Sequence, residues 1–225
     1  MKTITKSFSK FFFALLLVAT ISFSISFSSY AQSTTSLGVK GGVNIANFRG
    51  EDVKDADNRT AFNLGLVLNY SVAESVGLSL EADYSSQGAV NKGSTMNVGG
   101  IDITTDDATV KVDYLRTTLL FNYYMGSSEM NIRPELFAGP YLGFLLNSQA
   151  KSGSGDFEDY PDDTFKGTDF GAAFGAGLHI KVGEKMWLVP DVRYNLGLSN
   201  IYDSDDFTAR NGVLSVNLGL TFPLN

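Results

Sequence analysis

The stretch from Asp169 to Lys181 reads DFGAAFGAGLHIK and decides the fold. Every second residue from Phe170 to Ile180 is apolar, while the positions between carry glycine and alanine in the middle and polar residues at the ends. Side chains on a strand point alternately to opposite faces, so this pattern predicts one long strand with an apolar face and a polar or small face. Its length exceeds the roughly 5–6 residues of a soluble strand and suits the roughly 9–11 that a tilted strand needs to cross a bilayer.

The N-terminus has the composition of a secretory signal peptide. Three lysines precede a largely apolar run over residues 11–27, and Ser29-Tyr30-Ala31 supplies the small residues of a cleavage site. The sequence therefore predicts an exported chain with a signal peptide over residues 1–31. A membrane anchor is the alternative, and the serines within the apolar run count against it.

Residues 32–225 show no linker and are expected to form one domain. The chain has 17 Lys and Arg residues against 24 Asp and Glu, and three of the lysines lie in the signal peptide. An acidic balance without a basic stripe argues against a nucleic-acid partner. The absence of cysteine excludes disulfides, thiol nucleophiles and Cys-ligated metals. No later apolar run approaches the ~18 residues of a transmembrane helix, so any membrane span must be built from strands.

Seven further stretches repeat the alternation and bring the count to eight strands. The expected strands are 37–48, 60–70, 76–85, 109–125, 131–146, 169–181, 186–199 and 212–222. The polar segments 49–59, 88–108, 147–168 and 201–209 form long connections, and the connections between them are short. Long outer loops that alternate with short periplasmic turns are typical of bacterial outer-membrane barrels. The sequence thus predicts an all-β fold, an eight-stranded antiparallel up-and-down transmembrane β-barrel. A soluble barrel or sandwich is the alternative.

Two details refine this prediction. Val110 and Val112 are out of phase with the residues after Asp113, which suggests a bulge or an extension beyond the membrane at that point. Aromatic residues near the strand ends are expected to supply interfacial girdles: Phe48, Tyr70, Tyr84, Tyr123, Tyr124, Phe144, Tyr194 and Phe222.

If the apolar faces meet lipid, the opposite faces fill a lumen just wide enough for side chains. The charged residues on those faces are Lys40, Glu81, Asp83, Arg116, Arg133, Glu135, Lys181, Asp191 and Arg193. Since buried charges must be paired, five cations and four anions predict a structural ion-pair network that plugs the lumen. The space beside Gly171, Ala173, Gly175 and Gly177 is expected to be filled by Arg133, Tyr141, Trp187 and Arg193. A solute path is the alternative.

Four segments resemble the PorT-like outer-membrane β-barrel family: FAGPYLGFLL (137–146), DFGAAFGAGL (169–178), DVRYNLGLSNIY (191–202) and SVNLGLTF (215–222). The resemblance covers essentially all of residues 32–225. The family's fourth strand usually reads Leu-x-Ile-Pro-Leu-Leu, whereas residues 115–120 read LRTTLL and lack the proline. The resemblance implies a barrel in the bacterial outer membrane. Most members have no defined activity, and some are linked to protein secretion.

Signs of an enzyme are weak, so neither a catalytic residue nor a cofactor or metal is assigned. His179 is the only histidine, and no G-x-S-x-G elbow accompanies it; a hydrogen-bonding role in the lumen is expected instead. The loops are acidic, most of all at Asp159, Asp162, Asp163, Asp203, Asp205 and Asp206. Their spacing lacks the Gly and Glu of an EF-hand, so solvated charge is the simpler interpretation and loose divalent-cation binding the alternative.

Three functional hypotheses follow. The first is a non-enzymatic barrel that anchors structure or binds a partner through its outer loops. The second is a small porin-like channel, and the third is an accessory of secretion or envelope assembly. The expected partners are outer-membrane lipid and lipopolysaccharide, with envelope or secretion proteins, and the chain is expected to be a monomer.

Overall fold

The structure is a computed structural model. It describes residues 35–50, 53, 56–93, 95–98, 101–104, 106–161, 164–203 and 207–224. The expected signal peptide lies outside these residues. No helix in the described ranges is long and apolar enough to cross a membrane.

The described residues form eleven strands. They are β1 (Thr35–Arg49), β2 (Ala56–Ala73), β3 (Val76–Asn91), β4 (Thr95–Val98), β5 (Ile101–Thr104), β6 (Ala108–Tyr124), β7 (Ile132–Ser152), β8 (Glu158–Asp159), β9 (Thr168–Lys181), β10 (Trp187–Gly197) and β11 (Arg210–Pro223). The eight long ones correspond to the strands expected from the alternation.

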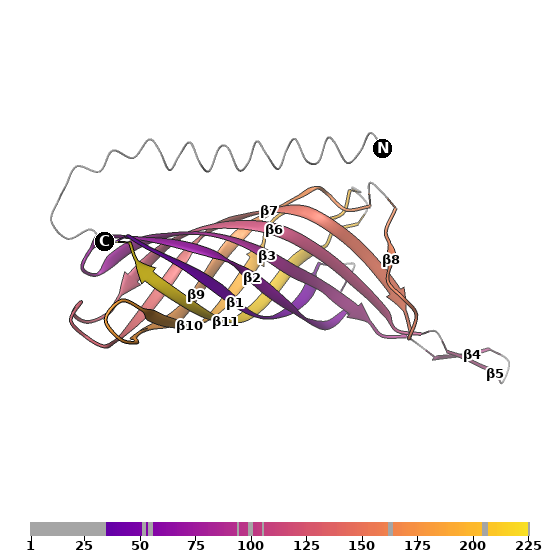
Figure 1. The fold of residues 1–225 in the computed structure, drawn as a ribbon. Helices are drawn as coiled ribbons and strands as arrows, with labels where there is room; N and C mark the ends of the chain where they lie inside the picture. The colour runs from indigo at the N-terminus through magenta and orange to yellow at the C-terminus, as the bar shows by residue number, and fades with distance from the viewer. Residues whose placement is uncertain are drawn as a thin grey trace. The chain divides into compact units, whose positions relative to one another are not determined.

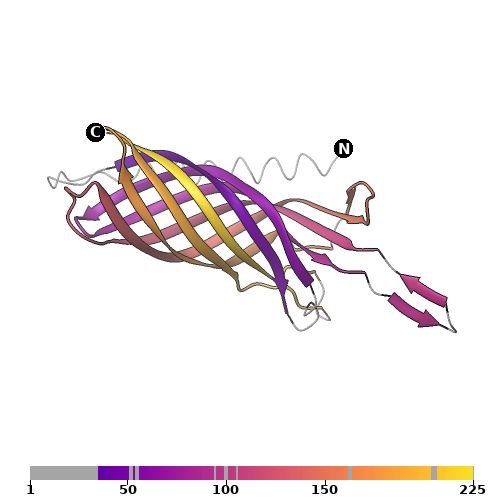
Figure 2. The same ribbon diagram turned by 90° about the horizontal axis from the view of Figure 1, so that it is seen from below.

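Eight strands close into a ring in the order β1-β2-β3-β6-β7-β9-β10-β11, and β11 pairs with β1. Every pairing is antiparallel, and β6 with β7 closes the remaining seam. Figures 1 and 2 show these strands tilted and side by side around the barrel. A closed ring leaves no strand edge unpaired, which is the condition for strands to cross a bilayer. The predicted up-and-down barrel is confirmed.

The barrel is apolar outside and polar inside. Leu64 is 61 % exposed and Phe174 46 %, whereas Glu81 and Arg193 are each 3 % exposed. A water-soluble barrel would show the reverse arrangement, because it would bury its apolar side chains. The outward band is therefore the surface that meets hydrocarbon.

The two ends of the barrel differ. Glu74 and Ser75 alone separate β2 from β3, and the short segments 125–131 and 182–186 join β6 to β7 and β9 to β10. Thr35 and Pro223 lie at this same end, because Ser36 pairs with Pro223. The other end carries the three longest connections, residues 92–107, 153–167 and 198–209, together with residues 50–55 between β1 and β2. By the usual arrangement of these barrels the short turns are periplasmic and the long loops are outside the cell.

The strands extend further into three of the expected loops than the alternation indicated. β2 begins at Ala56, β3 continues to Asn91 and β7 to Ser152, and the loops carry the β4–β5 hairpin and β8, which were not predicted. These additions pair backbone groups within the expected loop segments.

The irregularity expected near Asp113 is present, but it lies in β7 and does not set the phase of the valines. The β6–β7 register shifts between Asp113 and Tyr114, and the extra residue is Leu146 of β7. β6 itself keeps a single alternation, so Val110 and Val112 point inward. Two of the aromatic residues proposed for the girdles also point inward: Phe48 is 4 % and Tyr124 6 % exposed, and neither meets lipid.

A charge on the outer face should cost stability according to its depth. Leu66 and Val72 lie on the same face of β2, in mid-strand and beside the turn, and both are more than half exposed. We expect Leu66→Arg to lower the free energy of unfolding by roughly 2–4 kcal/mol and Val72→Arg by roughly 0–1 kcal/mol. Urea unfolding in lipid vesicles measures both, and equal costs would contradict the assignment of the lipid-facing band.

Candidate functional site: the lumen and its outer cap

A pair of opposite charges crosses the lumen from wall to wall. Arg193 belongs to β10 and Glu81 to β3, which lie four strands apart in either direction around the ring of eight. Arg193 Nη1 donates to Glu81 Oε2 at 2.7 Å and Nη2 donates to Oε1 at 3.2 Å. Two parallel bonds of this kind are the strong bidentate form of the pair. The side chains thus span the full diameter of the barrel.

Lys40 and Asp191 complete this arrangement, and the four residues together are called the charge cluster below. Lys40 Nζ lies 2.6 Å from Glu81 Oε2 and 3.9 Å from Asp191 Oδ2. Arg193 Nε donates to Asp191 Oδ1 at 2.9 Å. Two cations therefore alternate with two carboxylates, which offsets the cost of removing each charge from water.

A chain of amide side chains continues from the charge cluster to the far wall, and we call it the amide ladder. Asn217 Nδ2 donates to Asp191 Oδ1 at 2.7 Å, and Asn63 Nδ2 donates to Asn217 Oδ1 at 3.0 Å. Asn63 Nδ2 also reaches Asn44 Oδ1 at 2.8 Å, and Asn44 Nδ2 donates to Ser85 Oγ at 3.1 Å. The ladder joins β10, β11, β2, β1 and β3 across the lumen.

A second buried ion pair lies beside the first. Arg116 Nη2 donates to Asp83 Oδ2 at 2.9 Å, and both side chains are 3 % exposed. The guanidinium carbon of Arg116 lies 5.8 Å from the centre of the Tyr141 ring, which adds a cation–π contact. This pair fills the section of the lumen toward β6.

One cavity of about 30 Å³ adjoins the charge cluster on the short-turn side and is also lined by Glu135, His179, Ser79 and Asn122. A cavity needs roughly 10–15 Å³ for each water, so this one holds on the order of two. It is too small for a nutrient or a metabolite.

Seven of the nine residues predicted for the lumen network lie inside the barrel. The structure brings Lys40, Glu81, Asp191 and Arg193 together, pairs Asp83 with Arg116, and places Glu135 apart from them. Glu135 Oε2 lies 3.1 Å from His179 Nε2, so the histidine has the hydrogen-bonding role expected of it.

The other two predicted members, Arg133 and Lys181, lie outside the network. Lys181 is the last residue of β9 and is exposed. Arg133 sits at the short-turn end, where its Nη2 donates to the backbone oxygen of Glu74 at 2.7 Å and its guanidinium carbon lies 5.2 Å from the Tyr124 ring centre. Both residues have the inward phase, but both lie at strand ends, where a long side chain turns to water or to a turn.

The small residues of β9 face side chains that differ from those expected. A Cβ on Gly171 would lie 2.5 Å from the Tyr141 ring, and one on Gly175 would lie 2.7 Å from the Phe137 ring. At Gly177 it would lie 2.8 Å from Glu135 Oε1. Tyr141 is a predicted filler, whereas Arg133 and Trp187 are replaced by Phe137 and Glu135 from the neighbouring strand. These glycines admit bulky groups of β7 into the lumen.

Sequence reasoning missed a buried carboxylate, Asp169, at the outer end of the lumen. It is 1 % exposed and accepts hydrogen bonds from Tyr141 Oη, Ser199 Oγ and Asn211 Nδ2 at 3.1, 2.7 and 2.9 Å. Its alternation phase places it inside, and its position at a strand end concealed the burial. Because Arg133 and Lys181 lie outside the network, the predicted lumen residues that are buried include more carboxylates than cations, in contrast to the cation excess predicted, and Asp169 adds one more carboxylate.

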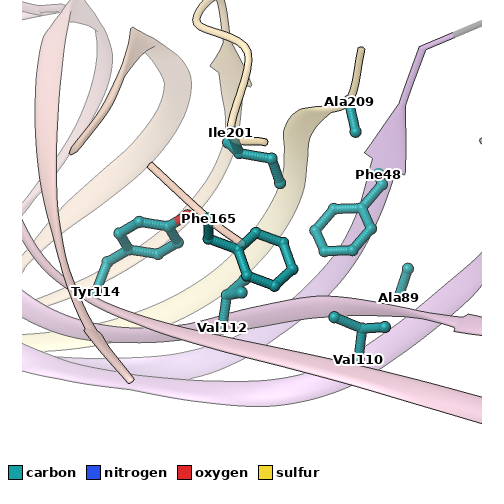
Figure 3. Close-up of a cluster of buried hydrophobic side chains, with 8 residues drawn as sticks. All are labelled: Phe48, Ala89, Val110, Val112, Tyr114, Phe165, Ile201 and Ala209. Atoms are coloured by element: carbon teal, nitrogen blue, oxygen red, sulfur yellow. The ribbon is translucent and has the colours of Figure 1, made fainter. Parts of the chain in front are cut away.

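Above the polar lumen, at the outer mouth, lies an apolar cluster that we call the outer cap. Its buried members are Phe48, Ala89, Val110, Val112, Tyr114, Phe165, Ile201 and Ala209. Figure 3 shows strand residues and loop residues converging on Phe165. The alternation that points polar residues inward at membrane depth thus points valine and tyrosine inward beyond it.

Two loops supply the top of the outer cap and are bonded to each other. Phe165 and Tyr202 form an isolated antiparallel bridge, with their rings 4.7 Å apart. Lys166 N donates to Ile201 O at 2.7 Å, and Asp203 N donates to Thr164 O at 3.1 Å. Burial raises the pKa of Tyr202 to about 12, so its hydroxyl stays neutral at physiological pH.

Only two of the six loop carboxylates considered for cation binding lie among the described residues. Asp159 is exposed and accepts a hydrogen bond from Gln149 Nε2 at 2.9 Å. Asp203 is held through its backbone to Thr164. Asp162, Asp163, Asp205 and Asp206 fall outside the described ranges, within which no group of three or more His, Cys, Asp or Glu side chains is arranged to hold a metal ion. Divalent binding by the loops stays a prediction.

Several solved barrels resemble this fold. A major outer membrane protein of Thermus thermophilus aligns at 11 % identity and a TM-score of 0.53, over 86 % of this chain and 100 % of that one. The N-terminal β-barrel domain of Pseudomonas aeruginosa OprF aligns at 16 % and 0.47, over 86 % and 100 % of the two chains. OprG of the same organism aligns at 18 % and 0.45, over 85 % and 96 %. At such identities the likeness concerns the fold alone.

A search of curated proteins finds no match to the chain. Residues 30–203 match the family described as outer membrane protein beta-barrel domain, which is more than half of the sequence. The match agrees with a closed ring whose apolar side faces outward. The chain belongs to the outer membrane protein beta-barrel domain family, and its location is the bacterial outer membrane.

Proposed function

We propose that this protein is a closed, non-enzymatic barrel that acts as an anchor or binds a partner through its outer loops. The observation that carries the proposal is the Glu81–Arg193 pair, which occupies the diameter of the lumen. The outer cap lies beyond this pair, at the outer mouth of the barrel. A barrel with both features works through its surfaces rather than through its interior.

The surroundings of His179 support a non-enzymatic role. The imidazole is engaged by Glu135 and packs against the rings of Tyr124 and Trp187, with ring centres 5.2 and 6.2 Å away. The adjoining cavity has room for about two waters, so no substrate of ordinary size fits beside it. His179 therefore acts as a hydrogen-bonding group in the lumen.

The outer loops are the part available to a partner. They are acidic, and the outer cap holds the loop segments around Phe165 and Tyr202 in a defined position. Outer-membrane lipid and lipopolysaccharide surround the apolar band, and we propose a monomer, since the ring closes without a second chain. The four segments that resemble the PorT-like family favour a partner in secretion or envelope assembly. Deletion of the gene would then change the secreted proteome.

Planar-bilayer recording tests the closure directly. We expect the wild-type protein to give no discrete conductance steps, because the charge cluster fills the lumen. A large porin reconstituted in the same chamber serves as the positive control. Reproducible single-channel steps from the purified protein would overturn the proposal in favour of the small channel.

The charge cluster should contribute strongly to stability. Arg193→Met leaves Glu81 and Asp191 with Lys40 alone, and breaking a buried pair costs roughly 3–5 kcal/mol. The matched control is Arg210→Met, since Arg210 is exposed at the start of β11 and its replacement should cost no more than about 0.5 kcal/mol. Urea unfolding in vesicles measures both, and similar values would show that the cluster is not structural.

The outer cap should protect the loops from proteases. Phe165 is 6 % exposed in the cap, whereas Phe157 of the same loop is 39 % exposed. We expect Phe165→Ala to speed tryptic cleavage after Lys166 by about tenfold or more, because the buried ring holds the two loops together. Phe157→Ala should leave the rate unchanged. Equal cleavage rates in wild type and Phe165→Ala would contradict the cap.

A further inference from the structure

Two of the eight seams in the barrel are interrupted at a proline. The β6–β7 ladder is interrupted where its register would pair Leu119 with Pro140 and Leu120 with Gly139, and it continues on either side of this gap. The β9–β10 ladder has the same kind of gap, where its register would pair Leu178 with Pro190 and His179 with Val189. Proline has no N–H to donate, so the facing carbonyls of Leu119 and Leu178 lose a ladder partner at a lipid-facing position.

Both interruptions border the same hairpin. β7 and β9 pair with each other without a break from Ile132↔Ile180 to Phe144↔Thr168. β7 is flanked by the β6 gap and β9 by the β10 gap. The hairpin is therefore a two-strand unit with a continuous ladder inside it and a weakened ladder on each side.

The lumen contacts follow the same division. The charge cluster comes from β1, β3 and β10, the amide ladder adds β2 and β11, and Arg116 adds β6. These interactions bind six strands to one another and bypass β7 and β9. The polar pairs of the hairpin, Glu135 with His179 and Tyr141 with Asp169, join its two strands to each other.

Several side-chain contacts join the hairpin to the six-strand part. Arg193 and Arg116 lie over the faces of Phe137 and Tyr141, at 4.8 and 5.8 Å. At the outer end, Ser199 and Asn211 donate hydrogen bonds to Asp169. At the short-turn end, Arg133 Nη2 donates to Glu74 O at 2.7 Å, and both gaps lie between these two attachments.

The cavity lies directly behind both gaps. Leu120, His179 and Val189 are the inward-facing residues of the interrupted segments, and all three line it. A small outward shift of the hairpin would open this space to the carbonyls of Leu119 and Leu178 without disturbing the charge cluster.

From these observations we propose that the β7–β9 hairpin is the moving wall of the barrel. It separates locally from β6 at Pro140 and from β10 at Pro190 while the charge cluster and the outer cap stay in place, and water held in the lumen cavity reaches the two gaps. In hydrocarbon an unpaired carbonyl is costly, so this water solvates the groups that the prolines leave without donors. The inference goes beyond the proposed closure and does not depend on any partner.

Residue-resolved amide exchange of the wild-type protein in phospholipid nanodiscs tests this. Leu119 and Leu178 each face a gap, whereas Val39 and Leu66 lie where the ladders on both sides of their strands are complete. All four side chains are on the outer face. We expect the amides of Leu119 and Leu178 to exchange at least about tenfold faster than those of Val39 and Leu66. Equal protection would overturn the proposal without any variant having to fold.

Substitution of the prolines identifies the cause. Pro140→Val and Pro190→Val restore an N–H at each gap, and exchange at the facing residue, Leu119 or Leu178, should slow to the rate of the two reference amides. Pro134→Val is the matched control, because Pro134 lies in a continuous stretch of the β7–β9 ladder and its oxygen accepts from Met125 N at 2.8 Å. Fast exchange that persists in both test variants would refute the role of the prolines. If the bilayer recording shows no conductance and the four amides exchange at equal rates, the proposed closure is retained and the moving wall is rejected.

Discussion

Hydrocarbon outside the barrel obliges the chain to neutralise its charges inside. The outward face carries exposed leucine, valine and phenylalanine, so charged side chains at membrane depth have only the lumen. Glu81 and Arg193 meet this constraint by pairing across the full diameter, and Lys40 and Asp191 extend the pairing to a second cation and carboxylate. The polar residues that surround them, above all the amide ladder, then satisfy the remaining hydrogen-bonding groups.

Each long strand passes through two environments along its length, the lipid bilayer and the water beyond it. At membrane depth β6 points Arg116 and Thr118 inward, and beyond it the same phase points Val110 and Val112 into the outer cap. The change in the chemistry of the inward residues marks the place where the wall leaves the lipid and the mouth must be closed like an ordinary protein core. Loop residues such as Phe165 supply the other half of that core.

The sequence predicts the features of this structure that depend on the two-residue alternation of side chains along a strand. The alternation in 169–181 and its seven repeats is enough for the strand count, the orientation of the faces and the interior position of Arg193. Partners across the lumen depend on the stagger of the strands, which no local pattern encodes. Arg133 and Lys181 have the phase of inward-pointing residues but lie at strand ends, outside the network. Asp169 has the same phase and also lies at a strand end, but this end is buried. The outer cap is not predicted, because its members come from segments expected to be polar loops, from valines out of phase with the later residues of their strand, and from Phe48, an expected girdle residue.

The orientation of the faces is tested most directly by spin labels on β11, since the chain contains no cysteine that would compete for labelling. Single cysteines at successive positions from Leu214 to Phe222 would be labelled in lipid vesicles and their collisions with oxygen, which concentrates in hydrocarbon, measured. The account predicts a period of two, with high collision rates at Leu214, Val216 and Leu218 and low rates at Ser215 and Asn217. High rates at the serine and asparagine positions, or no period at all, would contradict a barrel that turns its apolar side to the membrane.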